Sequence, residues 1–455
     1  MAEKEKGAST FATSSSVPGS SAANSAHLEQ NDKTSSGLNI DVAEYFKGPM
    51  TYHHSKWPGF MRLRGSVLPK MIIPLLFVGA WATMIGCIDK WVYPIGIESI
   101  LLTVTGFVVG LSLSFRSSTA YERYMDGRKY WAQLLFTSRN LARLIWVHAK
   151  ERHEESEELG KSDVLSKLAA LQLLNAFACA LKHRLRFEPS TEYPDLAPLL
   201  CNVKTLASEA DQAALRERKA SPWKTTGQHL GLSFAESNPR KLIKRAKDNL
   251  GNTPLEILTY LSSYFENLYT NQTMIIGTHQ VQATAMLASL TDVLSGTERV
   301  VNTPLPVAYS ISISQITWAY VLTLPFQLVK YLGWVTIPGT MLAGYIILGI
   351  AQIGRELENP FGLDVNDLPL DAYCQELASE IDALTSQPPP TDNATWMRDG
   401  GAKVLWPFSV MEYKGWEGRS LEDIRAALKL RSGSREVKIE RAGTMMHSHD
   451  LTNES

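Results

Sequence analysis

The stretch SILLTVTGFVVGLSLSF, residues 99–115, followed at once by RSSTAYERYMDGRKYW, residues 116–131, decides the fold of this 455-residue chain. The first half carries no charge and no proline. Together with residues 93–98 ahead of it, it is long enough to cross a bilayer, which takes roughly 20 residues. Arginine and lysine residues follow directly, and such an excess marks the cytosolic side of a span. The sequence therefore predicts a membrane helix that continues into a basic cytosolic helix.

Two stripes run along this predicted span. Phe107, Leu111 and Phe115 recur every four residues, so they share one face of the helix. The small residues with the same spacing on the neighbouring face are Gly106, Gly110 and Ser114. Small residues in this pattern allow helices to approach closely in lipid. On periodicity alone the bulky stripe is lipid-facing or part of a core, whereas a helix packed against symmetry-related copies would turn it toward a shared axis.

Composition excludes several function classes. Lysine and arginine (45) nearly balance aspartate and glutamate (46), so no global charge points to nucleic acid or to an acidic substrate. The four cysteines are scattered without a Cys-x-x-Cys pair, which indicates neither a disulfide framework nor a zinc site. We find no nucleophile motif, phosphate-binding loop or dinucleotide fingerprint. The sequence therefore does not predict an enzyme, and no cofactor is required.

Apolar windows and changes in charge divide the chain into regions. They are a serine-rich disordered lead (1–40), an interfacial segment (41–66), two membrane helices (67–116), a cytosolic helical region (117–303) with an insertion at about 189–252, two further membrane helices (304–354), a boundary loop and helix (355–386), and a mostly flexible tail (387–455). Basic residues flank the first pair of spans on both outer sides, so both termini are expected in the cytosol.

Two helices within this plan need comment. Residues 163–186 are apolar enough to resemble another span, but charged ends and frequent alanine favour a buried cytosolic helix. Residues 254–301 are expected to form one long helix, with Pro254 at its start and Asn302-Thr303-Pro304 after its end.

A family resemblance rests on two stretches. One is Phe115-Arg116…Ala120-Tyr121-Glu122-Arg123…Gly127-Arg128…Trp131. The other is Glu358-Asn359-Pro360-Phe361-Gly362, continuing through Asp364, Asp367 and Leu368-Pro369-Leu370-Asp371. With four spans and cytosolic helices between the second and third, the chain resembles the bestrophin-like anion channels over about residues 57–384. Ser118 replaces the family's usual Asn, and Tyr124 and Met125 replace its Trp pair.

The resemblance implies an all-α integral membrane protein with four transmembrane helices and a cytosolic helical domain, assembled as a homopentamer around a central pore. The family's apolar membrane constriction falls on Phe107, Leu111 and Phe115. Rings of such residues can gate by dewetting, and the partly positive edges of phenyl rings favour an anion. Arg116 and Arg123 would raise the local anion concentration below the constriction. The alternative is that these arginines anchor the helix or form salt bridges, and we expect this role more for Arg123 than for Arg116.

Two further features of the family map less closely onto this sequence. Its second, cytosolic constriction falls on Leu255 or Ile257. Animal members bind calcium at a loop after Asn-Pro-Phe-Gly, and the corresponding residues here are Glu356, Asn359, Asp364 and Asp367. Calcium takes six to eight oxygen ligands, and this loop offers few. The alternative is that the two aspartates brace the loop.

The resemblance, together with the stripe of Phe107, Leu111 and Phe115, thus implies a ligand- or voltage-modulated, passive channel for chloride and other small anions. Its expected partners are the lipid bilayer and further copies of itself. Two alternatives stay open: a cation-conducting channel on the same scaffold, and a non-conducting membrane adaptor whose insertion and tail recruit other proteins.

Overall fold

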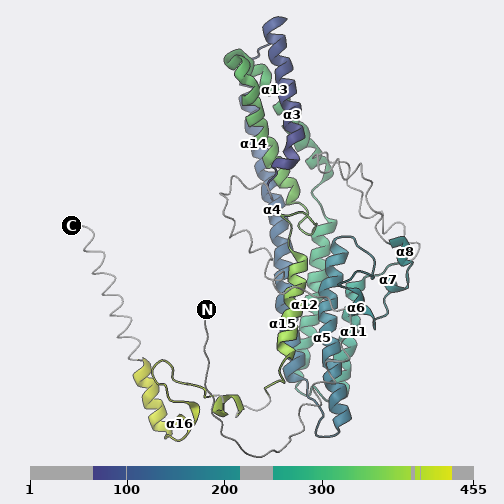
Figure 1. Cartoon of the computed structure of the whole chain (residues 1–455), viewed down its shortest axis with the longest axis vertical. Coiled ribbons are helices and arrows are strands. Elements are labelled where there is room, and N and C mark those ends of the chain that lie inside the picture. Colours follow the sequence, from purple (N-terminus) through teal and green to yellow (C-terminus); the bar gives the residue numbers. More distant parts are fainter. Residues whose placement is uncertain (1–64, 99, 216–248, 391–394, 400, 433–455) are drawn as a thin grey trace, which may run out of the picture. The chain divides into compact units, whose positions relative to one another are not determined.

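The computed structural model describes residues 65–98, 100–215, 249–390, 395–399 and 401–432 (Figure 1). Throughout these residues the regular secondary structure is helical. The predicted lead and nearly all of the interfacial segment lie outside the described residues, as does the centre of the predicted insertion.

One group of helices contains α3 (Leu68–Trp91), α13 (Val307–Leu332), α14 (Thr336–Glu356) and the first part of α4 (Ile100–Arg143). In this group α13 and α14 pack on each other, and both contact α3 and α4. Small buried clusters hold the group together, one around Val78 and Val321 and another around Val109 and Leu113. Many apolar side chains on the outside stay exposed, Leu76 among them. A helix that is apolar on all sides belongs in a core or in lipid, so this group has the surface of a membrane domain.

Three helical stretches of the described chain are long and apolar enough to cross a membrane, namely Leu68–Trp91, Glu157–Leu185 and Val307–Glu356. The last contains two helices, because α13 and α14 pack on each other and are joined by η4 (Gly333–Val335). Gly333 has a φ of 51°, which favours glycine at this reversal. The predicted third and fourth spans correspond to α13 and α14.

The second predicted span differs from expectation at its start. Residues 93–98 are not helical, and α4 begins only at Ile100. Pro94 and Gly96 interrupt the segment, the Asp89 carboxylate accepts a hydrogen bond from the Ile95 N–H (2.8 Å), and the Ile97 N–H donates to the Phe326 carbonyl (3.0 Å). The charge-free helical part therefore covers residues 100–115.

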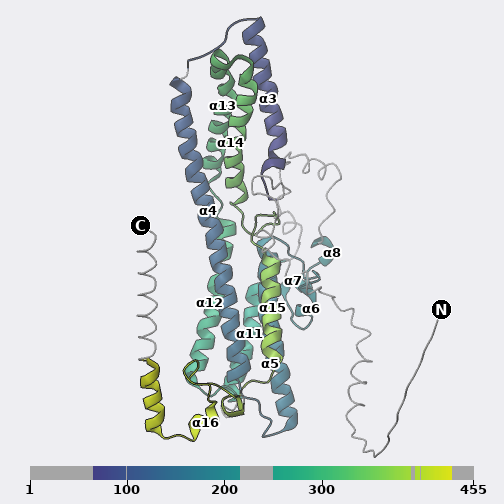
Figure 2. The ribbon, with the colours of Figure 1, turned by 60° about the vertical axis from the view of Figure 1, so that its left-hand side comes forward.

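The second group of helices continues from α4. That helix runs unbroken to Arg143, followed by a π-helical turn η3 (Leu144–His148), and contacts α5 (Glu157–Leu185), α12 (Gly277–Asn302) and α15 (Leu370–Thr385). With α11 (Thr253–Thr270), these helices surround one large apolar core. Figures 1 and 2 show α4 as the element common to both groups.

Two details of the predicted helices are wrong. Helix α5 begins at Glu157, not at residue 163, because Ser156 caps its N-terminus. Residues 254–301 do not form one helix. They form α11 and α12, with a break at residues 271–276 that is fixed by hydrogen bonds from Met274 N to Leu268 O (3.2 Å) and from Lys150 N to Thr273 O (2.9 Å).

The predicted insertion and tail contain short ordered elements. The first of these regions holds α6 (Ala197–Leu200), α7 (Leu206–Glu209) and α8 (Gln212–Leu215). The described part of the tail contains η5 (Thr395–Asp399), α16 (Tyr413–Glu417) and a helical segment at 421–432.

Candidate functional site

The predicted neck residues lie on a face of α4 that the chain's other described helices leave uncovered. Phe107, Leu111 and Phe115 are 73%, 47% and 58% exposed. On the opposite side of the same helix, Val109 and Leu113 are buried against α13 and α14. Bulky apolar side chains exposed at one-turn intervals require lipid or further protein around them. The face therefore suits contact with lipid or with other copies of α4.

The predicted packing residues have different surroundings. Gly106 lies against α13, because a Cβ placed there would be 3.0 Å from the hydroxyl oxygen of Tyr320. Gly110 has open space beside it and Ser114 is exposed. The small stripe thus has one member packed within the chain and two members free to approach another helix.

The two predicted anion-attracting arginines point into the subunit. Arg116 is 3% exposed, and its Nη2 lies 3.6 Å from Oε2 of Glu358. Arg123 donates to three backbone carbonyls, those of Glu358 (3.1 Å), Val300 (2.6 Å) and Thr303. Arg116 therefore forms the ion pair, which the sequence analysis expected more of Arg123. Their effect on passing anions stays a prediction.

The two stretches that carry the family resemblance contact each other. Gly127 of α4 lies under the boundary loop, since a Cβ there would be 3.0 Å from Phe361 and 3.1 Å from Pro360. One turn further along α4, the fully buried Trp131 packs with its ring centroid 6.0 Å from that of Tyr373. Residues more than two hundred positions apart in sequence thus form one contact surface.

The predicted calcium ligands form a braced loop. The ammonium of Lys70 contacts Glu356 (2.9 Å) and Asp364 (3.3 Å). Asp367 accepts a hydrogen bond from the Asp364 N–H (2.7 Å), and a Cβ on Gly362 would come within 2.6 Å of the same carboxylate. Burial above all, with the nearby acidic groups, raises the pKa of Asp367 to about 6.

This arrangement fits the bracing alternative better than calcium binding. A lysine ammonium occupies the place between two of the four predicted ligands, where calcium would need oxygen atoms. Within the described residues, no group of three or more histidine, cysteine or acidic side chains is placed to hold a metal ion. Asn359 lies on the same loop, beside Gly362. The calcium site stays a prediction.

The two candidates for the cytosolic aperture have opposite surroundings. Leu255, in the first turn of α11, is exposed, whereas Ile257 is fully buried in the large core. A side chain enclosed by its own subunit cannot line an opening between subunits. Ile257 is therefore corrected to a core residue, and Leu255 alone retains the aperture prediction.

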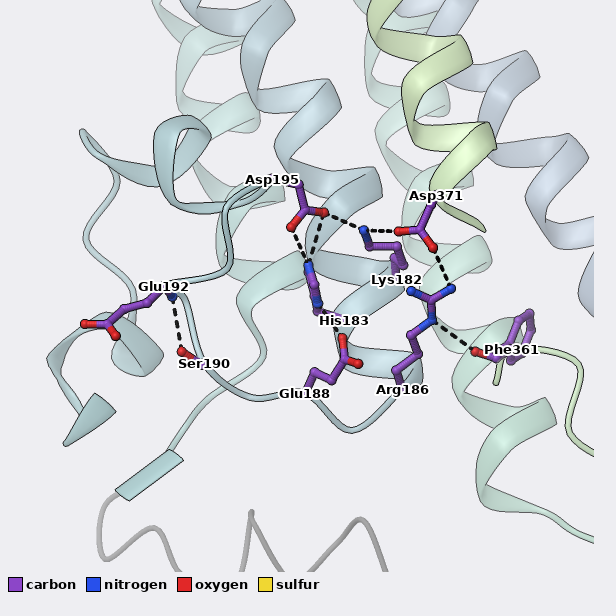
Figure 3. Close-up of polar contacts among 9 residues, drawn as sticks. All are labelled: Lys182, His183, Arg186, Glu188, Ser190, Glu192, Asp195, Phe361 and Asp371. Atoms are coloured by element: carbon purple, nitrogen blue, oxygen red, sulfur yellow. Dashed lines mark hydrogen bonds and ion pairs between the residues drawn. The ribbon is translucent and has the colours of Figure 1, made fainter. Parts of the chain in front are cut away.

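A charge network around the buried Lys182 and His183, at the end of α5, was missed from the sequence (Figure 3). Lys182 contacts Asp195 and, at 2.6 Å, Asp371 at the start of α15. Both ring nitrogens of His183 face carboxylates, Glu188 at 2.6 Å and Asp195 at 3.0 Å. Burial alone would lower the pKa of His183, but these two carboxylates outweigh it and raise the pKa.

The network joins the end of α5 to the start of α15 and to the boundary loop. Arg186 donates to Asp371 (2.9 Å) and to the Phe361 carbonyl (3.4 Å). The sequence signal was available, because Lys182, His183, Arg184 and Arg186 follow an apolar helix while Asp371 belongs to the second motif stretch. The sequence alone could not show which of these charged side chains contact one another.

The family described as "Bacterial/Fungal Bestrophin protein" matches residues 50–383. A protein of Synechocystis sp. named as a voltage-dependent anion channel-forming protein is 33% identical over 347 residues, which cover 74% of this chain and 96% of the relative. A Nostoc sp. protein of the same description is 32% identical, covering 72% of this chain and 91% of the relative.

A solved structure shows the same fold. The crystal structure of a bacterial bestrophin homologue from Klebsiella pneumoniae, carrying a single mutation, superposes with a TM-score of 0.52 at 21% sequence identity. The match covers 70% of this chain and all of the solved chain. At this identity the likeness supports the arrangement of helices alone.

Proposed function

Because the chain belongs to the bacterial and fungal bestrophin family, we propose that it is a membrane protein that conducts small anions passively, chloride among them. The family resemblance read from the sequence is confirmed by the match over residues 50–383 and by two relatives named as anion channel-forming proteins.

The observation that carries the proposal is the uncovered face of α4. In a symmetric assembly with α4 helices around a shared axis, copies of Phe107, Leu111 and Phe115 form stacked apolar rings. A narrow apolar constriction admits an ion only when it stays wet or when the ion sheds water at low cost. Phenyl edges carry partial positive charge and favour an anion at this point.

The same proposal includes the topology and assembly. Four spans are formed by α3, the apolar part of α4, α13 and α14, with both termini in the cytosol and five copies around the pore. Helix α5 has the composition of a span. We assign it to the cytosolic group because it packs against α11 and α15 and contributes Lys182 and His183 to the charge network.

The arginines below the neck contribute through their charge. Arg116 and Arg123 have their guanidinium groups turned to Glu358 and to backbone carbonyls. They therefore act on anions at a distance, as fixed positive charge that raises the local anion concentration.

The test is an ion-flux measurement on the purified full chain. Recordings in a planar bilayer with asymmetric chloride should reverse near the chloride equilibrium potential, and voltage steps in the same preparation test voltage dependence. Native mass spectrometry of the sample measures the number of copies. Reversal near the cation potential would support the cation-conducting alternative, and no flux at all would support the adaptor.

Replacement of the neck residues tests their role. Phe107→Ala and Phe115→Ala should change conductance or gating, because each widens an apolar ring. The matched control is Phe77→Ala on α3. Phe77 is an exposed phenylalanine away from the neck face, and its ring centroid lies 6.1 Å from that of Trp318. Currents unaltered by the neck substitutions, or altered equally by the control, would remove the pore role of this stripe.

A further inference from the structure

A cavity of about 440 Å³ lies beside α4 at the level where its charge-free part ends. Three segments form its walls: α4 at Arg116, the start of α13 with the residues just before it, and the end of α14 with Glu358 beyond it. The polar residues in its lining are Arg116, Ser310, Ser314, Arg355 and Glu358. It is separate from the uncovered face of α4 that carries the predicted neck.

The charge in the cavity is not balanced. Two guanidinium groups, Arg116 and Arg355, share a single lining carboxylate, Glu358. The two arginines repel each other, while Glu358 attracts both. Arg116 is buried whereas Arg355 is exposed, and a buried charge that is not fully compensated is unfavourable unless an opposite charge joins it. The lining therefore favours an anion.

Buried polar atoms in the lining lack partners. Arg116 is almost entirely buried, yet its Nε makes no hydrogen bond, and its contact with Glu358 at 3.6 Å is longer than a hydrogen bond. The hydroxyl of Ser310 is buried without a partner as well. Buried polar groups are satisfied in nearly all proteins, so these two groups point to an occupant that accepts hydrogen bonds.

Two further features supply donors. The Ser314 hydroxyl oxygen accepts from Arg355 Nη2 (3.3 Å), which leaves its own proton available to a ligand. Helix α13 begins at Val307, one of the residues that line the cavity, and the first N–H groups of a helix have no partner within the helix. Together with Arg116, these donors favour an oxyanion at this helix end.

We propose that this cavity binds a phosphate group through Arg116, Arg355 and the hydroxyls of Ser310 and Ser314. Planar guanidinium groups pair best with ligands that offer several oxygen atoms. Chloride is a single spherical ion, so it cannot offer a separate acceptor atom to each of two guanidinium groups and two hydroxyls. The phosphate can come from a phospholipid headgroup, whose chains would lie along the exposed Val307 and Ile311, or from free phosphate.

The experiment uses the purified full chain in neutral detergent and two probes. Inorganic phosphate is titrated at constant ionic strength against chloride, with calorimetric detection. In the second arm, native mass spectrometry compares retention of phosphatidic acid with retention of diacylglycerol, the matched lipid without phosphate. Binding of phosphatidic acid alone assigns the occupant to lipid, and binding of inorganic phosphate assigns it to the free ion.

Two variants should shift the affinity in opposite directions. Arg355→Gln should weaken binding of the responding probe by about tenfold or more, the usual effect of losing a hydrogen bond from a charged group. Glu358→Gln should tighten it, because the carboxylate competes with phosphate for Arg116. The control is Arg143→Gln, an exposed arginine near the far end of α4 that contacts Asn140. It should leave binding unchanged.

The proposal is overturned if the wild-type protein retains neither probe selectively, or if the two variants fail to differ in the direction of their effect. A variant that merely loosens the fold weakens binding in both cases, so tightening by Glu358→Gln separates a ligand site from a structural role. The measurements report binding without conduction. They can therefore succeed or fail independently of the flux assay that tests the channel.

Discussion

Replacing Phe361 by alanine should destabilise the protein by about 3–5 kcal/mol, the usual range for removing a buried phenyl ring. The ring is fully buried and lies against Gly127 of α4, while the Phe361 carbonyl accepts a hydrogen bond from Arg186. The loss should therefore appear as a large fall in the unfolding temperature of the purified protein.

The partner substitution, Gly127→Ala, gives the sharper test. The added methyl group would lie 3.0 Å from the Phe361 ring and 3.1 Å from Pro360, closer than ordinary contact. Overpacking of this kind costs about 1–3 kcal/mol, and the better helix propensity of alanine returns about 1 kcal/mol. The expected net loss is up to about 2 kcal/mol. Once Phe361→Ala has removed the ring, Pro360 is the remaining close contact, and the same methyl group should cost less than it does in the wild type.

The assay is a double-mutant cycle. Unfolding of the four proteins in detergent is followed by tryptophan fluorescence, to which the buried Trp131 on the same face of α4 contributes. We expect a coupling of about 1–2 kcal/mol, within the range for side chains in contact. Phe136→Ala, an exposed phenylalanine further along α4, is the control and should change stability little. If Gly127→Ala destabilised both backgrounds equally, the contact described between the two motif stretches would be wrong.

Three further predictions concern the charges around this contact. Since the pKa of His183 is raised, the stabilising effect of its charge is complete below pH about 6.5, the ordinary pKa of histidine, and disappears as the pH rises through the raised value. The unfolding temperature of His183→Gln should therefore vary less between pH 5 and 9 than that of the wild type. Parallel curves of unfolding temperature against pH would contradict this. Arg123→Lys should lower the unfolding temperature almost as much as Arg123→Gln, because one ammonium group cannot reach all three carbonyls that the guanidinium binds; full rescue by lysine would show that charge alone is needed. Lys70→Met should leave Glu356 and Asp364 without their shared cation, so calcium should raise the unfolding temperature of this variant more than that of the wild type. A larger calcium-induced shift in the wild type would support the predicted calcium site in the unaltered loop.

The helices expected to cross the membrane were the most predictable part of the fold. The two further membrane helices expected within residues 304–354 correspond to α13 and α14, and Pro306 and Gly333 mark the start and the end of α13. The break between α11 and α12 was not predictable, since residues 271–276 contain neither glycine nor proline. It depends on hydrogen bonds, including one from Lys150 far away in the sequence. Local signals thus located helix ends that Pro and Gly mark, and missed one that tertiary contacts impose.

The candidate sites also divide into those that local spacing predicts and those that depend on tertiary contacts. Spacing placed Phe107, Leu111 and Phe115 on one face, and the structure leaves that face uncovered. Spacing could not choose between Leu255 and Ile257, because the choice depends on which side of α11 meets the core. The charge network and the arginine cavity each draw on several separate elements, and no single stretch of sequence contains enough of either to show it.

The two faces of α4 explain why its sequence supports two different kinds of inference. Arg116, Ala120, Gly127 and Trp131 follow one another at intervals of four or seven residues and are all buried, so these four residues of the first motif stretch lie on the side of one long helix that packs within the chain. Its residue types are set by contacts that a single chain displays, such as the fit of Gly127 under Phe361. The stripe at Phe107 lies on the other side of the helix, where no described segment of the chain covers it. Its role depends on what surrounds the subunit, and therefore only flux through the assembled protein can establish it.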